Sequence, residues 1–194
     1  MPDTKITIGV LSQGTIKTET VSSLIMAINT IYVPIQVVFY QGAYIHDSRN
    51  KVAEAAIKDG STHLMFIDYD MVFPESGITT LLSRRKEIIG GLYNARKFPL
   101  KLAAFSLNSE GFTRQIRHDE VPTEPFKIGG IGAGFLLIET GVFKKIEQPY
   151  FSVEPWGNGT IGEDVYFCIK AGKVGIEVWA DPTIPLKHIG DYAY

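Results

Sequence analysis

Segments rich in β-branched and aromatic residues alternate with helix-like segments over the first half of the chain. The strand-like segments cover residues 5–11, 35–40, 63–68 and 87–93. Helix signals lie between them, over about residues 19–28, 47–60 and 74–84, with Asp47 and Ser48 as cap candidates and Pro74 in a first turn. Strands that alternate with helices of about ten residues form parallel sheets with right-handed crossovers. This alternation therefore predicts an α/β core.

The pattern changes after about residue 100. Residues 102–118 predict two strands around an Asn-Ser-Glu-Gly turn, and residues 129–138 are a glycine-rich approach to another apolar strand. Residues 162–175 predict a helix that begins with acidic residues and ends before Gly175, and a strand follows at 176–181. We expect antiparallel additions to the core, and hence a mixed, mainly parallel sheet flanked by helices. The polar segment 108–125 is a candidate mobile flap.

The composition fits a single domain over residues 1–194 and argues against several kinds of partner. Of the 194 residues, 45% are hydrophobic, and the formal net charge is −2. Nucleic acids and anionic membrane surfaces usually bind a basic face, so neither is expected. The single cysteine, Cys168, cannot form an internal disulfide, and residues 1–11 lack the regions of a signal peptide. No apolar run approaches the roughly 20 residues of a membrane span. We expect a cytoplasmic protein without such a span.

Two carboxylates one residue apart follow the third predicted strand. Asp68 and Asp70 leave the same face of an extended chain, where like charges repel each other unless a cation lies between them. Oxygen ligands suit Mg²⁺ or Mn²⁺, and the ligands of open α/β sheets collect at the carboxyl ends of the strands. The pair therefore indicates a divalent metal site. The alternative is a chance spacing in which one aspartate caps the helix near Pro74.

A second acidic pair and a late histidine extend this hypothesis. Glu163 and Asp164 begin a predicted helix, where they are candidates for a general base and for a hydrogen-bond acceptor to a hydroxyl substrate. The alternative is that the two acids only complement the helix dipole. His188 follows an apolar strand and is either a metal ligand or a structural histidine.

The motifs FIDYDM, GIGAGFLLIETGVF, GEDVYFCIKAGKVG and DPTIPLKHIG occur in this order along the chain. Together they resemble the GT-A glycosyltransferases, in particular the small family-2-like enzymes of bacteria and viruses. The resemblance implies a GT-A, Rossmann-like fold with a nucleotide-binding half at about 1–100 and an acceptor and catalytic half at about 101–194. It also implies a nucleoside-diphosphate sugar as donor, with a UDP-sugar favoured, and Mn²⁺ or Mg²⁺ as cofactor. A viral member would act in the host cytoplasm.

The resemblance assigns roles to individual residues. Asp70 is the principal metal ligand, Asp68 contacts the metal or the donor, and His188 is a further metal ligand. Asp164 is the catalytic base, and Glu163 contacts the acceptor. The other expected donor contacts are Ser12, Gln13, Gly14, Arg49, Asn50, Tyr69, Arg96, Gly132 and Gly134, and Trp156 is expected to stack on a sugar.

Several of these contacts have an ordinary structural alternative. Gln13 could lie in a plain polar loop, and Arg49 could form a local ion pair. The glycines could mark a bulge or the entry to a strand, and Trp156 could be a buried anchor.

The sequence thus predicts a metal-dependent glycosyltransferase, inverting because of the Glu-Asp pair, that transfers a sugar to a hydroxyl group. The acceptor, which is a glycan, a lipid-linked molecule or a protein, is not specified. A sugar nucleotidyltransferase is a second enzyme class, but it normally has a glycine-rich basic loop after the first strand, and residues 10–19 are poor in glycine. The third alternative is a nucleotide-sugar-binding module that has this fold without turnover.

Overall fold

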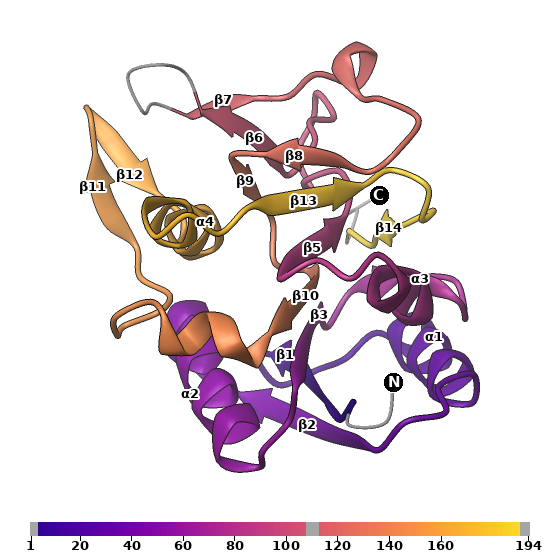
Figure 1. Ribbon diagram of the computed structural model, residues 1–194. Coiled ribbons are helices and arrows are strands. Elements are labelled where there is room, and N and C mark those ends of the chain that lie inside the picture. Colours follow the sequence, from indigo (N-terminus) through magenta and orange to yellow (C-terminus); the bar gives the residue numbers. More distant parts are fainter. Residues whose placement is uncertain (1–3, 108–112, 191–194) are drawn as a thin grey trace.

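A seven-stranded sheet forms the centre of the computed structural model, which describes residues 4–107 and 113–190 (Figure 1). Its strands are β1 (Ile6–Ser12), β2 (Ile35–Gln41), β3 (His63–Asp68), β5 (Ile88–Gly91), β8 (Phe126–Ile128), β10 (Phe135–Glu139) and β13 (Val178–Asp181). The helices are α1 (Thr18–Ile28), α2 (Ile45–Lys58), α3 (Gly77–Ser83) and α4 (Glu163–Lys173), with the 3-10 helices η1 (His118–Glu120) and η2 (Thr140–Lys144).

Short strands form three small sheets beside the central one. One sheet pairs β4 (Met71–Val72) with β14 (Lys187–His188), and another pairs β11 (Glu154–Trp156) with β12 (Gly159–Ile161). The third contains β6 (Ala104–Leu107), β7 (Thr113–Gln115) and β9 (Gly130–Ile131).

The central sheet has the strand order β2-β1-β3-β10-β5-β13-β8. The neighbours β2, β1 and β3 are parallel to one another, as are β5 and β13. In contrast, β10 is antiparallel to both β3 and β5, and β8 is antiparallel to β13. The expected mixed, mainly parallel sheet is therefore confirmed, but the antiparallel strand β10 lies in its middle.

Alternate residues of the central strands point to opposite faces of the sheet, and each face packs against its own helices. In β3, Leu64 and Phe66 belong to a hydrophobic cluster that includes residues of α2, η2 and α4. Met65 and Ile67 belong to a second cluster, which includes residues of α1 and α3. Full burial of each such side chain contributes about 1.5–3 kcal/mol. Helices therefore cover both faces, as Figure 1 shows.

The structure confirms the three helices predicted in the first half of the chain and corrects two of their starts. Helix α2 begins upstream of Asp47 and Ser48, so neither residue caps it. Instead, Ser48 Oγ donates a hydrogen bond of 2.9 Å to the carbonyl of Tyr44, one turn earlier. Helix α3 begins after Pro74, because that proline lies in a turn closed by a 2.9 Å hydrogen bond from Gly77 N to its carbonyl.

In the second half of the chain, the predicted pair of strands is present as the antiparallel pair β6 and β7. The turn between them, residues 108–112, lies outside the described residues, and so does the start of the candidate flap. Its described part contains β7 and η1, and the mobility of this segment stays a prediction. The predicted helix 162–175 is α4, and the predicted strand after it is β13, parallel to β5.

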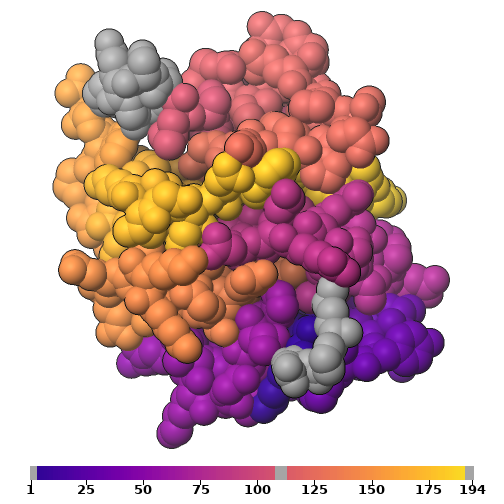
Figure 2. Space-filling model, viewed as in Figure 1, coloured from indigo at the N-terminus to yellow at the C-terminus, as the bar shows by residue number. Residues whose placement is uncertain are grey.

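Several polar segments meet at one edge of the sheet. Ser12 ends β1 and Asp68 ends β3, so both lie at the carboxyl edge of the parallel strands. Figure 2 shows the early segments, in indigo and purple, in the lower part of one face of the molecule, and later segments above them. Within residues 4–107 and 113–190, no helix has the length and apolar character needed to cross a membrane.

Candidate functional site

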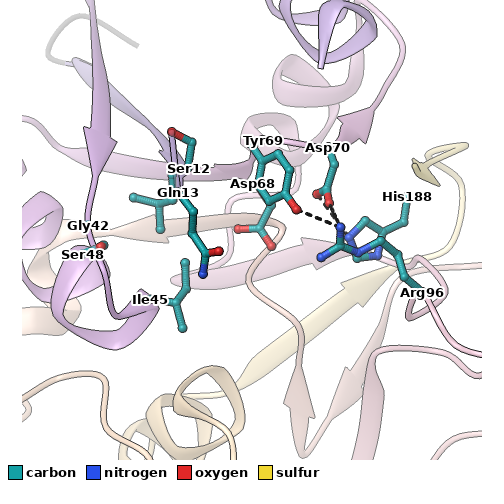
Figure 3. A pocket seen from close by; sticks show the side chains of 11 residues that line it. Ser12, Gln13, Gly42, Ile45, Ser48, Asp68, Tyr69, Asp70, Arg96 and His188 are labelled. Carbon is teal, nitrogen blue, oxygen red and sulfur yellow. Dashed lines mark hydrogen bonds and ion pairs between the residues drawn. The ribbon is translucent and has the colours of Figure 1, made fainter. Parts of the chain in front are cut away.

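A cavity of about 240 Å³ lies at the carboxyl ends of β1 and β3 (Figure 3). It is lined by Leu11, Ser12, Gln13, Gly42, Ile45, Ser48, Asp68, Tyr69, Asp70, Arg96 and His188. Seven of these residues were predicted to bind the donor or a metal, so the fold brings together segments from β1, β3, the loop after β5 and β14. In Figure 3, Gln13 and Ile45 lie toward one end of the cavity, and Asp70, Arg96 and His188 lie toward the other.

Asp70 is a buried carboxylate at the end of this cavity that lies away from Gln13. Arg96 Nη1 lies 2.6 Å from Asp70 Oδ2, and His188 Nε2 lies 3.2 Å from Asp70 Oδ1. Both contacts have ion-pair distances but lack hydrogen-bond geometry. Among the described residues, the two Asp70 oxygens and His188 Nε2 therefore have no hydrogen-bond partner. Buried polar atoms without partners are rare in folded proteins, so this pair is a candidate ion site.

The protonation of His188 strengthens that interpretation. Its Nδ1 lies 3.0 Å from the carbonyl oxygen of Asn94, which can only accept a hydrogen bond, and this contact assigns the ring proton to Nδ1. In the neutral ring, Nε2 then presents a lone pair to the Asp70 carboxylate. A cation shared by Asp70 and His188 would remove the resulting repulsion. Carboxylate and imidazole groups are both common ligands of divalent metal ions in proteins.

Arg49 is a buried cation that connects Asp68 to Glu163. Its side chain is 3% exposed. Nη2 donates to Asp68 Oδ1 at 3.0 Å, Nε donates to Glu163 Oε1 at 3.2 Å, and Nη1 donates to the carbonyl of Ala133 at 3.2 Å. Burial lowers the pKa of Arg49, but Asp68 and then Glu163 raise it above its usual value, so the guanidinium stays charged. Its contacts are with protein groups, and its predicted contact with the donor stays a prediction.

The hydrogen bond from Arg49 also limits the contact that Asp68 can make with a metal ion at this site. Within the described residues, no three side chains of His, Cys, Asp or Glu are grouped so that they could hold one metal ion. One oxygen of Asp68 is already bound by Arg49. The metal contacts of Asp70, His188 and Asp68 all stay predictions.

The acidic pair Glu163 and Asp164 begins α4, as the sequence predicts. Desolvation and the adjacent Glu163 raise the pKa of Asp164 to about 6, although Arg49 acts in the opposite direction. At pH 7 such a carboxylate is ionised, and it is more basic than an ordinary aspartate. These are the properties of a general base for a hydroxyl group.

Tyr93 is a site residue that the sequence analysis missed. It follows β5, its Oη accepts a 2.9 Å hydrogen bond from Gly134 N, and its ring meets His188 edge-on with 5.2 Å between centroids. Burial raises its pKa well above the usual value. A Cβ on Gly132 or Gly134 would lie 2.3 or 2.8 Å from this Oη. Here the two glycines make room for Tyr93, and their donor contact stays a prediction.

Three further predicted site residues do not line the cavity, and neither do Arg49, Gly132, Gly134, Glu163 and Asp164. Gly14 lies beyond Gln13, with a positive φ of 129° that favours glycine. The Asn50 amide exchanges hydrogen bonds of 2.8 and 3.0 Å with the backbone of Phe151. Trp156 is partly buried and packs on a hydrophobic cluster formed with α4. The donor and acceptor roles of these residues stay predictions.

Apart from Leu11 of β1, the wall residues that the sequence analysis missed come from the loop after β2 and the start of α2. Gly42, Ile45 and Ser48 line the cavity. A Cβ on Gly42 would lie 2.3 Å from Ser48 Oγ, so this loop packs closely on the helix. The signal was available, because the loops that follow neighbouring parallel strands meet at one edge of a sheet.

Comparisons with known proteins support the fold. No protein-family model matches the sequence, and no curated protein matches it. Among solved structures, A197 from STIV has a TM-score of 0.67 and 16% identity, over 96% of this chain and 86% of A197. TarS 1–349 from S. aureus in complex with UDP-GlcNAc has a TM-score of 0.54 and 10% identity, over 98% of this chain and 60% of that fragment.

A third structure, from Desulfovibrio desulfuricans, is described as a candidate nucleotide-diphospho-sugar transferase. It is 12% identical over 92% of this chain and 79% of that one, with a TM-score of 0.48. At these identities the likeness concerns the fold. The chain shares its mixed α/β fold with A197 and with the TarS fragment.

Proposed function

We propose that the protein is a glycosyltransferase that uses a nucleoside-diphosphate sugar, with a UDP-sugar as the favoured donor and Mn²⁺ or Mg²⁺ as cofactor. The fold supports this proposal, as does the UDP-GlcNAc bound to the structurally similar TarS fragment. The observation that carries it is the buried pair Asp70 and His188 at the wall of the cavity, whose facing atoms have ion-pair contacts but no hydrogen-bond partner among the described residues.

Asp70 and His188 would hold the cation. When bound, the cation supplies positive charge against the departing diphosphate. Arg96 lies beside Asp70 and contributes a second positive charge that is 39% exposed. Its Nη1 also donates a 2.9 Å hydrogen bond to Tyr69 Oη, which directs the guanidinium along the cavity wall. Guanidinium groups bind phosphate oxygens well, so Arg96 is placed to contact the diphosphate.

The opposite end of the cavity suits the nucleoside. Gln13 offers an amide that can both donate and accept hydrogen bonds, Ser12 offers a hydroxyl, and Ile45 gives an apolar surface. A base that lies there would place its diphosphate toward Asp70 and Arg96, since these residues lie at the other end in Figure 3.

In the proposed inverting transfer, Asp164 takes the proton of the acceptor hydroxyl. The oxygen then forms a bond to the anomeric carbon, while the bond from that carbon to the diphosphate oxygen breaks and its electrons leave with the diphosphate. Glu163, held by Arg49, accepts a hydrogen bond from the acceptor. The pKa of about 6 keeps Asp164 in the basic form at neutral pH.

Isothermal titration of UDP and GDP, with and without Mn²⁺, tests the donor and cofactor. We expect Mn²⁺-dependent binding of UDP to the native protein, and at least about ten-fold weaker binding to Asp70→Asn. The matched control is Asp119→Asn, which changes an exposed aspartate of η1. If the affinity for UDP depends neither on Mn²⁺ nor on the Asp70 substitution, the metal site is refuted.

Turnover is tested separately by the release of UDP from a panel of UDP-sugars. We expect Asp164→Asn to bind UDP as the native protein does and to lose most of the release. A protein that binds UDP but releases none from any sugar would instead be the nucleotide-sugar-binding module considered from the sequence.

A further inference from the structure

A second cavity adjoins the first one. Its volume is about 840 Å³, and Arg96 and His188 line both cavities. Its walls come from the segment after β5, which supplies residues 93–98, Leu100 and Ala103, and from the segment around β14, which supplies residues 186–188 and Gly190. A group bound there would therefore lie next to the proposed diphosphate position.

Both walls are fixed by backbone hydrogen bonds. In the loop after β5, Ala95 N donates to the carbonyl of Lys101 at 2.8 Å, and Ala103 N donates to the carbonyl of Tyr93 at 2.9 Å. In the other wall, β14 pairs with β4, and Ile189 N donates to the Asp70 carbonyl at 2.9 Å. The cavity is thus preorganised, which reduces the entropic cost of binding.

Every charged side chain among the described residues that line this cavity is positive. Arg96, Lys97 and Lys187 line it, and no aspartate or glutamate does, although Arg96 is paired with Asp70 behind the wall. Neither Lys97 nor Lys187 forms an ion pair with a carboxylate of the described residues. Since the whole chain has a formal net charge of −2, this local excess of cations is a distinctive feature. It favours an anionic ligand.

Apolar side chains lie beside these cations. Phe98 is 66% exposed and Leu100 is 50% exposed, and both line the cavity together with Leu186. A surface of this kind fits a ligand that carries an apolar group next to its anion.

We propose that the second cavity binds the acceptor, and that this acceptor carries a phosphate group next to an apolar group. This inference rests on the proposed function. The donor diphosphate belongs to the first cavity, near Asp70, so the lysines of the second cavity are available for the other substrate. Lys97 and Lys187 hold the phosphate, while Leu100 and its apolar neighbours contact the hydrocarbon part.

Isothermal titration of hexyl phosphate tests this proposal on the full chain, with UDP and Mn²⁺ at saturating concentration. We expect hexyl phosphate to bind also when UDP is present. The double variant Lys97→Gln/Lys187→Gln is expected to bind about 25-fold more weakly, at roughly five-fold for each exposed ionic contact. The control, Lys58→Gln/Lys144→Gln, removes the same charge from exposed ends of α2 and η2 and is expected to bind within two-fold of the native protein.

Two further titrations identify the ligand. Hexanol tests the need for the phosphate, and inorganic phosphate tests the need for the apolar part. We expect both to bind more weakly than hexyl phosphate, and we expect Leu100→Ser to weaken hexyl phosphate but not inorganic phosphate. Equal affinity for hexyl and inorganic phosphate would overturn the amphiphilic acceptor and indicate a free phosphate site.

Three results would overturn the second site itself: no binding of hexyl phosphate, loss of its binding when UDP is added, or equal weakening in the control double variant. Loss on addition of UDP would assign the lysines to the donor diphosphate. A failure of the proposed function is separate, because it appears as absent UDP binding in the titration without hexyl phosphate.

Discussion

Replacement of Arg49 by methionine tests whether this buried cation holds the two acidic parts of the site together. Methionine keeps much of the apolar stem and removes the guanidinium, so Asp68 and Glu163 lose a partner at 3.0 and 3.2 Å. Removal of one partner of a buried ion pair costs about 3–5 kcal/mol, because the remaining charge stays poorly solvated. The Asp68 and Glu163 side chains are 22% and 13% exposed, so they recover some hydration by turning toward water. We therefore expect the free energy of unfolding to fall by about 3 kcal/mol, the lower end of that range.

Urea unfolding, followed by the fluorescence of Trp156 and Trp179, measures this loss. Domains of this size have a free energy of unfolding of about 5–15 kcal/mol, so Arg49→Met should lower the midpoint strongly and leave the slope unchanged. The control is Arg114→Met, which breaks an ion pair whose arginine is 57% exposed and should cost less than about 1 kcal/mol.

A second substitution separates the lost ion pair from lost packing. In the Arg49→Met background, Asp68→Asn removes one of the two carboxylate charges that lost their partner. The substitution should therefore raise the free energy of unfolding by about 1 kcal/mol or more. In the native background, the same Asp68→Asn change should destabilise the protein. A loss below about 1 kcal/mol for Arg49→Met, or no coupling between the two positions, would refute the argument that Arg49 is a buried counterion.

Two further predictions concern the catalytic acid pair and the packing beside it. Sugar transfer should fall as the pH drops through about 6, since Asp164 accepts a proton only when it is ionised and its pKa is raised to about 6; a pH–rate profile of UDP release checks this, and a rate that stays constant down to pH 4.5 would exclude Asp164 as the base. Gly132→Ala would place a Cβ 2.3 Å from Tyr93 Oη, so we expect a loss of about 1–3 kcal/mol in urea unfolding. The control Gly141→Ala, at a position with open space around the added Cβ, should be close to neutral, and equal losses in both variants would contradict the steric argument.

The regular elements could be predicted from the sequence where one local pattern decides them. The apolar segment 63–68 forms β3 and ends in Asp68, and residues 163–173 form α4 with its acids in the first turn. The place of β10 could not be read in this way. A glycine-rich approach followed by apolar residues is compatible with an edge or with the centre, and its pairing with β3 and β5 depends on residues 45 or more positions away.

The lack of a local sequence pattern for long-range contacts also explains which parts of the site could not be predicted. Asp70 and His188 were candidates because of residue type and order, and the fold places them 3.2 Å apart. Arg49 was expected at the donor, but its partner Glu163 lies 114 positions later in the chain, and no local pattern reveals such a contact. Tyr93 was missed for a similar reason, since its role depends on the backbone of Gly134. Side-chain direction within a helix turn or a loop is set by tertiary packing, which the sequence does not display locally.

The central place of β10 has a consequence for synthesis of the chain on the ribosome. The strands β1, β2 and β3 on one side, and β5 and β13 on the other, are joined within the sheet only through β10. A nascent chain that has not yet reached residue 135 therefore exposes the unpaired edge of β3, with buried residues such as Leu64 and Phe66 beside it. Such open edges pair readily with other chains. The first hundred residues should thus be prone to aggregate when they are produced as a separate fragment, and they gain their partner strand only when the second half has emerged.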